Sequence, residues 1–98
     1  MLVKIIKSYR DIVAICDSEL LGKRFEQGKF QLDVKESFFG GDKMNEKKTI
    51  EIMRDMEKED ATFNIIGKKS VNAALKAGII KQEGIGKIDN IPFALVLI

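Results

Sequence analysis

Short apolar runs separated by polar segments open the chain, and their spacing predicts β-strands. Residues 2–6 (LVKII) and 12–16 (IVAIC) are rich in β-branched side chains and flank a polar connection. Two such runs joined in this way predict an antiparallel hairpin with a polar tip. Residues 30–35 then alternate, and Phe30, Leu32 and Val34 share one face, which predicts a half-buried strand.

Two later segments have the periodicity of amphipathic helices. In residues 45–59, Met53 lies among apolar positions that share one helical face, and Asn45 has the chemistry of an N-cap. A second helix is predicted for residues 68–77. It should end at Gly78, because glycine readily adopts the left-handed conformation that stops a helix.

The remaining segments predict further strands and turns. Residues 61–66 have the pattern of a short strand, and residues 85–98 that of a final hairpin whose second strand is buried on both faces. The hairpin should turn at residues 89–90. Asp17 precedes residues 18–23, which could form one or two helical turns, and it occupies the expected capping position.

This order of elements predicts an α+β fold of one domain over residues 1–98. Two helices are too few to cover both faces of a large parallel sheet. We therefore expect a two-layer sandwich, in which a mixed, mostly antiparallel sheet carries both helices on one side.

Charge and cysteine content limit the partners and the cellular compartment that we expect for the protein. The 17 basic and 15 acidic residues give a net charge of +2, which permits a nucleic-acid partner without requiring one. A surface rich in lysine and glutamate with few amides is typical of thermophilic organisms. Cys16 is the single cysteine, which favours a reducing cytoplasm. No segment suits a membrane span or a signal peptide, so we expect a cytoplasmic protein with no membrane partner.

The absence of histidine excludes several chemistries. A Ser-His-Asp or Cys-His arrangement within one chain and a structural zinc site all need residues that this chain lacks. We expect no catalytic residue, no metal and no cofactor. Cys16 is either a small core residue or, if a helix starts at Asp17, a thiol with a lowered pKa, although the carboxylate would oppose that effect.

The segment NIIGKKSVNAALKAG, residues 64–78, resembles an anion site most closely. A complete phosphate-binding loop would need a glycine at Thr62 and a serine or threonine directly after Lys68, and both are missing. What remains is a strand, Gly67 and a helix start, where free N–H groups can bind an anion. The alternative is that Gly67 only makes the turn and that the lysines are solvated.

Two small basic groups are candidates for contact with nucleic acid. Tyr9, at the tip of the first hairpin, could stack on a base while Lys7 and Arg10 meet phosphate. Lys23 and Arg24 form the second group. In each case the alternative is an ordinary solvated turn.

The stretches VAICDSELLGKRFEQGKFQLDVKESFFGG and ATFNIIGKKSVNAALKAGII together resemble the archaeal domain-of-unknown-function family four-twenty-four. This resemblance implies an archaeal, cytosolic α+β protein and no established activity, substrate or cofactor. Members often carry tyrosine at the position of Phe39, an acidic residue at that of Lys68 and histidine at that of Phe93. The candidate anion site therefore rests on Gly67, Lys69 and Ser70.

Three functions compete on these grounds. The first is a non-enzymatic binding module in RNA or ribosome housekeeping, and its affinity would depend on salt. The second is a small-anion ligand-binding protein or enzyme, with a pocket joining Gly67 to Gly40 and Gly41. The third is an interaction subunit of a protein complex, using the apolar C-terminal strand and the pair Phe38 and Phe39.

Overall fold

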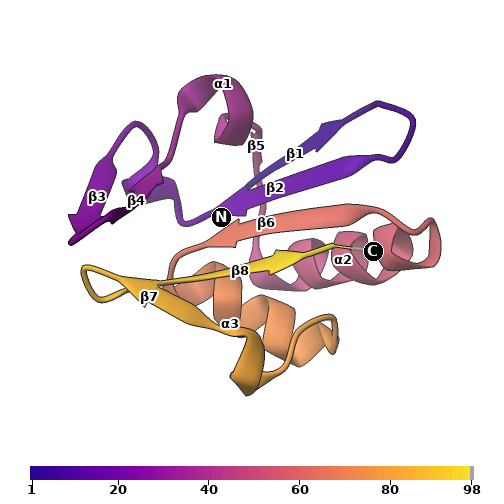
Figure 1. The fold of residues 1–98 in the computed structure, drawn as a ribbon. Coiled ribbons are helices and arrows are strands. Elements are labelled where there is room, and N and C mark those ends of the chain that lie inside the picture. The colour runs from indigo at the N-terminus through magenta and orange to yellow at the C-terminus, as the bar shows by residue number, and fades with distance from the viewer. Residues whose placement is uncertain (98) are drawn as a thin grey trace.

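The chain folds into a mixed six-stranded sheet with helices on one face and a small hairpin over part of the other (Figure 1). The computed structural model describes residues 1–97. The elements in chain order are β1 Leu2–Ile6, β2 Ile12–Cys16, η1 Ser18–Leu20, β3 Arg24–Gln27, β4 Phe30–Asp33, α1 Glu36–Phe39, β5 Asp42–Lys43, α2 Glu46–Lys58, β6 Thr62–Ile66, α3 Lys68–Ala77, η2 Gln82–Gly84, β7 Gly86–Ile88 and β8 Ile91–Val96.

The sheet has the strand order β5-β1-β2-β6-β8-β7. The central strands β2 and β6 run parallel, with Ile15 opposite Ile65, and every other pair is antiparallel. The parallel pair is buried on both sides at its carboxyl end, which explains why both strands are rich in Ile, Val and Phe. The prediction of a mixed, mostly antiparallel sheet in an α+β fold is confirmed.

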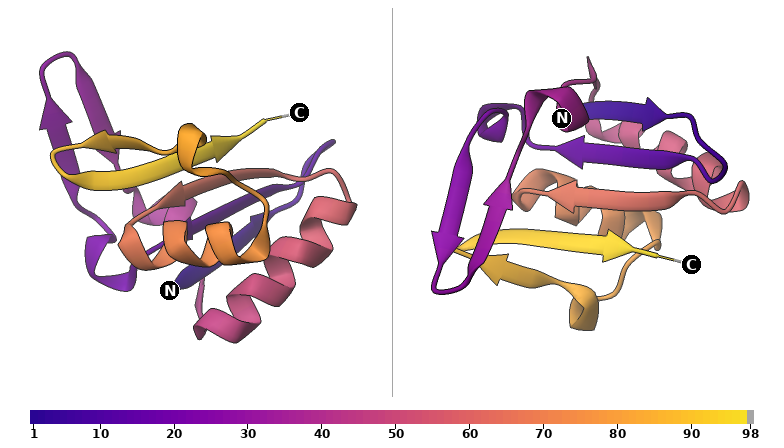
Figure 2. Two further views of the ribbon diagram at one scale, coloured as in Figure 1. Left: turned by 90° about the horizontal axis from the view of Figure 1, so that it is seen from below. Right: turned by 45° about the horizontal axis from the view of Figure 1, so that its top comes forward.

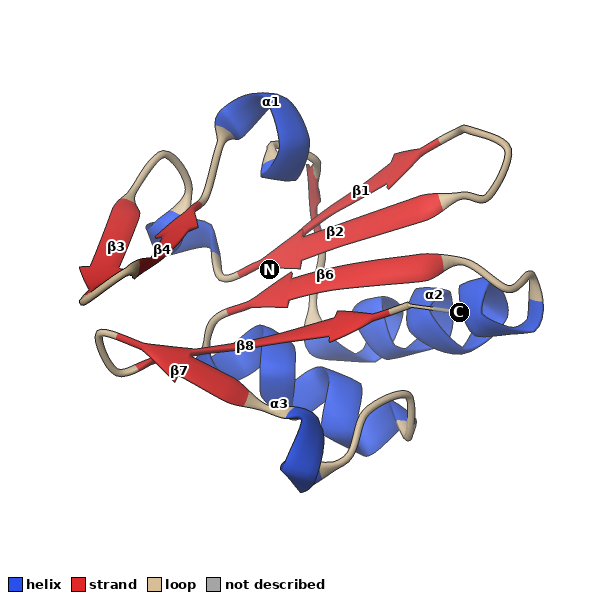
Figure 3. Ribbon diagram, viewed as in Figure 1, coloured by secondary structure: helices blue, strands red, loops and turns tan. Residues whose placement is uncertain are grey.

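Helices α2 and α3 lie together on the first face of the sheet, as predicted (Figure 3). Asn45 caps α2, because its Oδ1 accepts a hydrogen bond from the Lys48 N–H at 2.8 Å. Helix α3 ends at Gly78, which has the left-handed conformation. Met53 and Phe63 are fully buried in the core between the helices and the sheet.

The second face is covered at one end only, by η1, the β3–β4 hairpin and α1. Figure 2 shows this hairpin standing beside the end of the main sheet. A second core forms underneath, where Val34 and Phe39 pack with Ala14 and Cys16. Strand β3 was not predicted from the sequence, and this cover adds a partial third layer to the two that were expected.

Two local predictions were wrong, and a third was right only in part. Phe30 is 70% exposed rather than sharing the burial of Leu32 and Val34, because it lies at the tip of the β3–β4 hairpin, away from the second core. Strand β8 is not buried on both faces, since Leu95 is exposed on the second face, where no element covers it. Asp17 occupies the N-cap position of η1, as predicted, but its side chain makes no capping hydrogen bond there. Ile98, the last residue of the predicted final hairpin, lies outside the described residues.

Candidate functional site

The helix start that the sequence singled out lies beside Asp17. Strands β2 and β6 are parallel neighbours, so their carboxyl ends bring Asp17 next to the start of α3. The Asp17 carboxylate accepts hydrogen bonds from the Ser70 N–H at 2.8 Å, the Ser70 hydroxyl at 2.7 Å and the Lys69 N–H at 3.1 Å. Both Asp17 and Ser70 are buried. The protein's own carboxylate therefore occupies the position in which an external anion was expected.

Gly67 makes this arrangement sterically feasible. Its φ of +113° lies where side chains are strongly disfavoured. A Cβ at this position would lie 2.3 Å from the Asp17 Cγ. The candidate residues Gly67, Lys69 and Ser70 are thus brought together by the fold, but around Asp17, and only Lys69 directs an exposed side chain to solvent.

Gly40 and Gly41 do not share a hollow with this helix start. They line a hollow with Val3, Lys4 and Met44 beside β1, whereas Gly67 lines a smaller one with Asp17 and Pro92. Gly41 approaches the backbone so closely that a Cβ there would lie 2.1 Å from the Val3 carbonyl oxygen. The close approach of two backbone segments accounts for this glycine, and the pocket expected to join both regions does not form among the described hollows.

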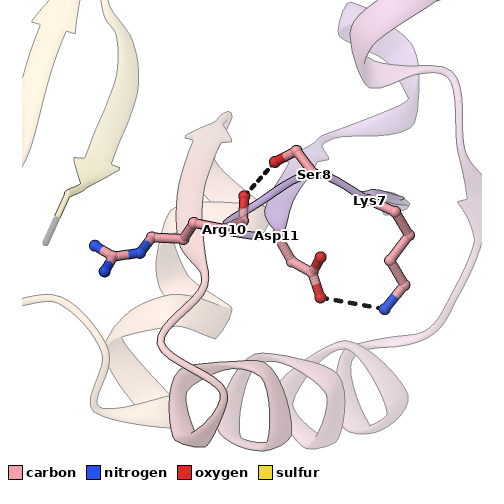
Figure 4. A network of polar contacts seen from close by, with 4 residues as sticks. All are labelled: Lys7, Ser8, Arg10 and Asp11. Carbon is pink, nitrogen blue, oxygen red and sulfur yellow. Dashed lines mark hydrogen bonds and ion pairs between the residues drawn. The ribbon is translucent and has the colours of Figure 1, made fainter.

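The tip of the β1–β2 hairpin carries the first basic group (Figure 4). Lys7 forms an ion pair with Asp11 at 3.1 Å, and the Ser8 hydroxyl donates a hydrogen bond to the Arg10 carbonyl oxygen. The Arg10 side chain extends away from that ion pair. Tyr9 is fully exposed, so its ring is available for stacking.

Lys23 and Arg24 lie at the other end of the molecule, where the β3–β4 hairpin begins (Figure 1). The Arg24 guanidinium forms an ion pair with Glu26 at 3.3 Å and donates a hydrogen bond to Gln31. The fold therefore keeps the two basic groups apart, and each includes a cation that is already paired with an acidic neighbour.

Cys16 is a buried core residue, in agreement with the first of its two interpretations. Burial, reinforced by the neighbouring Asp17 carboxylate, raises the pKa of the Cys16 thiol to about 11. At neutral pH the thiol is protonated and shielded from solvent, which is the opposite of an activated nucleophile.

The feature that sequence reasoning missed is a hollow on the second face, which we call the apolar groove. It has a volume of about 450 Å³. Its floor comes from β6 and β8, and its walls from β4 and α1. The lining residues are Phe30, Gln31, Leu32, Asp33, Phe38, Phe39, Asn64, Ile65, Ile66, Ile88, Phe93 and Leu95.

The groove presents large side chains that the fold leaves unburied. Phe30 is 70% exposed and Leu95 is 56% exposed. Phe38 stands half-buried in the wall and contacts Phe39 edge-to-face at 5.1 Å between ring centres. Asn64, which lies opposite Leu95 in the strand register, places one polar side chain in the apolar floor. The pair Phe38 and Phe39 and the apolar C-terminal strand were the sequence signals that pointed here, while the exposure of Phe30 and Leu95 depends on tertiary structure.

Residues 1–97, which the structure describes, contain neither a metal-binding cluster nor a membrane-spanning helix. No group of three or more Cys, Asp or Glu side chains is arranged to hold a metal ion there. None of the helices in that part of the chain is long and apolar enough to cross a membrane.

Comparison with known proteins gives a family and a fold. Residues 6–98 match the model of a family described as "Protein of unknown function (DUF424)". No curated protein matches the sequence. The fold is similar to that of an uncharacterized conserved protein from Methanopyrus kandleri, solved by crystallography, with a TM-score of 0.87 and 22% sequence identity. The match covers 97% of this chain and 88% of that one.

Proposed function

This chain belongs to the DUF424 family, whose function is unknown, and we propose that it is a non-enzymatic binding module that holds a partner protein in the apolar groove. The observation that carries this proposal is the set of exposed aromatic and aliphatic side chains around one hollow, above all Phe30. Leaving a side chain of this size in water forgoes about 1.5–3 kcal/mol of burial free energy. A partner that covers Phe30 would recover part of it.

The lining of the groove defines the chemistry of the partner. Phe38, Phe93 and Leu95 suit leucine-sized or aromatic side chains, and the volume of about 450 Å³ lies in the range of pockets that enclose several apolar groups. Asn64 in the floor and Asp33 at the rim could bind backbone or amide groups of the same segment. We therefore propose an apolar segment of a protein, with at most a few polar atoms, as the ligand.

The test compares two exposed aromatic residues at opposite ends of the molecule. A partner is identified by co-purification from an archaeal extract, and its affinity for the purified chain is measured by calorimetry. We expect Phe30→Ala to weaken binding about tenfold or more, as for an interface hot spot, and Tyr9→Ala to change it less than about twofold. Unchanged binding by Phe30→Ala, or no partner that binds the purified chain, would contradict the proposal.

A second candidate is contact with RNA, in ribosome-linked housekeeping, and the fully exposed ring of Tyr9 favours it. Lys7 and Arg10 flank this ring at the hairpin tip, where a base could stack while phosphates meet the cations. Titration with bulk archaeal rRNA or tRNA at low and moderate salt tests this candidate. Binding that weakens with salt and is lost in Tyr9→Ala supports it, whereas no binding at low salt removes it.

The helix start carries no function in this proposal. An external anion at Gly67, Lys69 and Ser70 would have to displace the buried Asp17 carboxylate, which already accepts three hydrogen bonds there. Both retained candidates act by docking, which accords with a sequence that has no histidine and a single, protonated thiol.

We also propose an archaeal, thermophilic and cytoplasmic setting for the protein. The resemblance of the sequence, its Lys/Glu-rich surface and its single buried cysteine support this setting. A thermal unfolding midpoint well above ~65 °C is the expected result, since mesophilic domains cluster below that temperature. A midpoint in the mesophilic range would contradict the thermophilic part.

A further inference from the structure

One edge of the main sheet is only half covered. Strand β7 pairs with the first half of β8, and its register ends where Gly86 faces Phe93. In the part of the chain that the structure describes, no strand pairs with residues 94–96 on that side, although β6 continues along the other side to Val96 (Figure 2, right).

The backbone geometry shows which residues face this open edge. The Gly67 N–H donates to the Pro92 carbonyl oxygen at 2.9 Å, so the backbone groups of Pro92 point toward β6. Because these groups alternate along a strand, those of Ala94 and Val96 also point toward β6. The N–H and C=O groups of Leu95 therefore point outward.

This edge lacks the features that keep strand edges from pairing. Natural sheets protect open edges with charged side chains, proline or bulges. No charged residue occurs between Ile91 and Leu97, and the exposed side chains there are leucines, with Leu95 56% and Leu97 74% exposed. The opposite edge of the sheet differs, since it ends in the two-residue strand β5 with Asp42 and Lys43.

A hollow lies beside the open edge, between residues 95–97 and the connection from α3 to β7 at residues 79–84. It has a volume of about 460 Å³ and is lined by Ile79, Ile80, Lys81, Glu83, Gly84, Leu95, Val96 and Leu97. Most of this lining is apolar or backbone, and its two charged residues have opposite signs. An added strand would therefore meet no excess of either charge.

We propose that a second copy of this chain occupies the edge, so that two sheets join through antiparallel pairing of β8 with β8 of the second copy. The position of β7 limits the register. If Leu95 paired with Leu95 of the second copy, Leu97 of the second copy would lie opposite Phe93. Gly86 of β7 already pairs with Phe93 on that side, so this register is excluded. Moving the two-fold axis to Val96 pairs Leu95 with Leu97 in both directions, and neither residue then faces a position that β7 holds.

This occupant is favoured because the segment is complementary to itself. With the two-fold axis at Val96, Leu95 lies beside Leu97 of the second copy on the second face of the sheet, and the two Val96 side chains lie together on the first face. Residues 91–97 contain no charged side chain, so this contact buries no charge from them. A two-fold contact uses the same edge of both copies and closes both, whereas an open-ended contact would lead to fibres. The proposal concerns an edge and does not depend on the partner of the apolar groove, although Leu95 borders both.

The first experiment is sedimentation equilibrium from micromolar to submillimolar concentration. We expect the wild-type chain to dimerise and Leu95→Pro to weaken the dimer at least tenfold. Proline at this position removes only an outward N–H, so pairing with β6 is retained, and circular dichroism checks the fold. Leu95→Ala keeps the N–H and should dimerise more strongly than Leu95→Pro. A wild-type chain that is monomeric throughout, or a Leu95→Pro dimer of wild-type affinity, would overturn the proposal.

Cysteine trapping tests the register itself. Directly opposed residues that do not share hydrogen bonds lie about 4.5 Å apart between Cα atoms, which suits a disulfide. We expect Val96→Cys to form a covalent dimer under mild oxidation. Leu95→Cys should form little, because in this register position 95 faces position 97 of the second copy and the two introduced cysteines are offset by two residues. The wild type, which carries only the buried Cys16, is the control for cross-linking through that residue. Equal cross-linking of both variants, or none in Val96→Cys, would contradict the two-fold axis at Val96.

Discussion

Asp17 and Ser70, which are 53 positions apart in the sequence, are joined by two hydrogen bonds to one buried carboxylate oxygen. This contact links the end of β2 to the first turn of α3. It places a negative charge at a helix N-terminus, where the helix dipole and two N–H groups that have no acceptor within the helix stabilise it.

Replacement of this carboxylate should destabilise the fold more than loss of an ordinary cap. We expect Asp17→Ala to lower the free energy of unfolding by about 2–4 kcal/mol, because buried donors on Lys69 and Ser70 lose their partner. Asn45→Ala removes the exposed cap of α2 and should cost only about 1 kcal/mol. Urea unfolding of both variants measures the difference, and equal costs would argue against a special role for the buried contact.

Gly67 should tolerate no side chain. In Gly67→Ala the new Cβ would meet the Asp17 carboxyl group at a positive φ, so we expect a loss of about 3 kcal/mol or more. Gly84→Ala is the matched control, because nothing lies within 4 Å of a Cβ at that position. Its effect should stay within about 0.5 kcal/mol. A Gly67→Ala protein as stable as the control would show that Asp17 can move aside easily.

The Cys16 thiol should make stability fall in alkaline solution. In the unfolded chain the thiol loses its proton near pH 9, whereas in the folded chain its pKa is raised to about 11. Between these values the unfolded state binds fewer protons, so the free energy of unfolding decreases as pH rises. Other groups titrate there too, and the measurement is therefore the difference between wild type and Cys16→Ala. That difference should change from pH 8 to 11, and parallel curves would contradict the assignment.

Phe30 and Phe39 should respond differently to truncation although both line the groove. Phe39 is 4% exposed and belongs to the second core, so Phe39→Ala should cost about 3–5 kcal/mol. Phe30 is mostly in solvent, and Phe30→Ala should cost less than about 1 kcal/mol. Thermal and urea unfolding compare the two variants. A large loss for Phe30→Ala would mean that the ring supports the fold, and it would remove the argument for a docking role.

The elements that were predicted well carry their signals locally. Helix α3 has the predicted bounds, since its apolar face and Gly78 lie within one short segment. Asn45 caps α2 through the residue three positions later, which is also a local contact. Strand β3 was missed because its sequence, RFEQ, has a single apolar residue and no alternation to detect.

The candidate sites were harder to predict because their geometry arises from distant segments. Gly67, Lys69 and Ser70 were correctly placed together at a helix start, but their carboxylate partner is Asp17, which directly follows β2 and is brought there by the parallel pairing of β2 with β6. The apolar groove combines β4, α1, β6 and β8, and no periodicity reveals which apolar side chains the final packing leaves exposed.

The two ends of the β3–β4 hairpin lie side by side and are joined by backbone hydrogen bonds. The Gly22 N–H donates to the Val34 carbonyl oxygen at 2.7 Å, and the Val34 N–H donates to the Lys23 carbonyl oxygen at 2.9 Å. These two bonds close the base of the hairpin, and the tip is held by a third, from the Asp89 N–H in the β7–β8 turn to the Gln27 side chain at 2.7 Å, so residues 28–30 are the part of the hairpin whose side chains can change with least effect on the main sheet. Related proteins can thus change the ligand preference of the groove by substitutions at the tip of this one hairpin, where Phe30 lies.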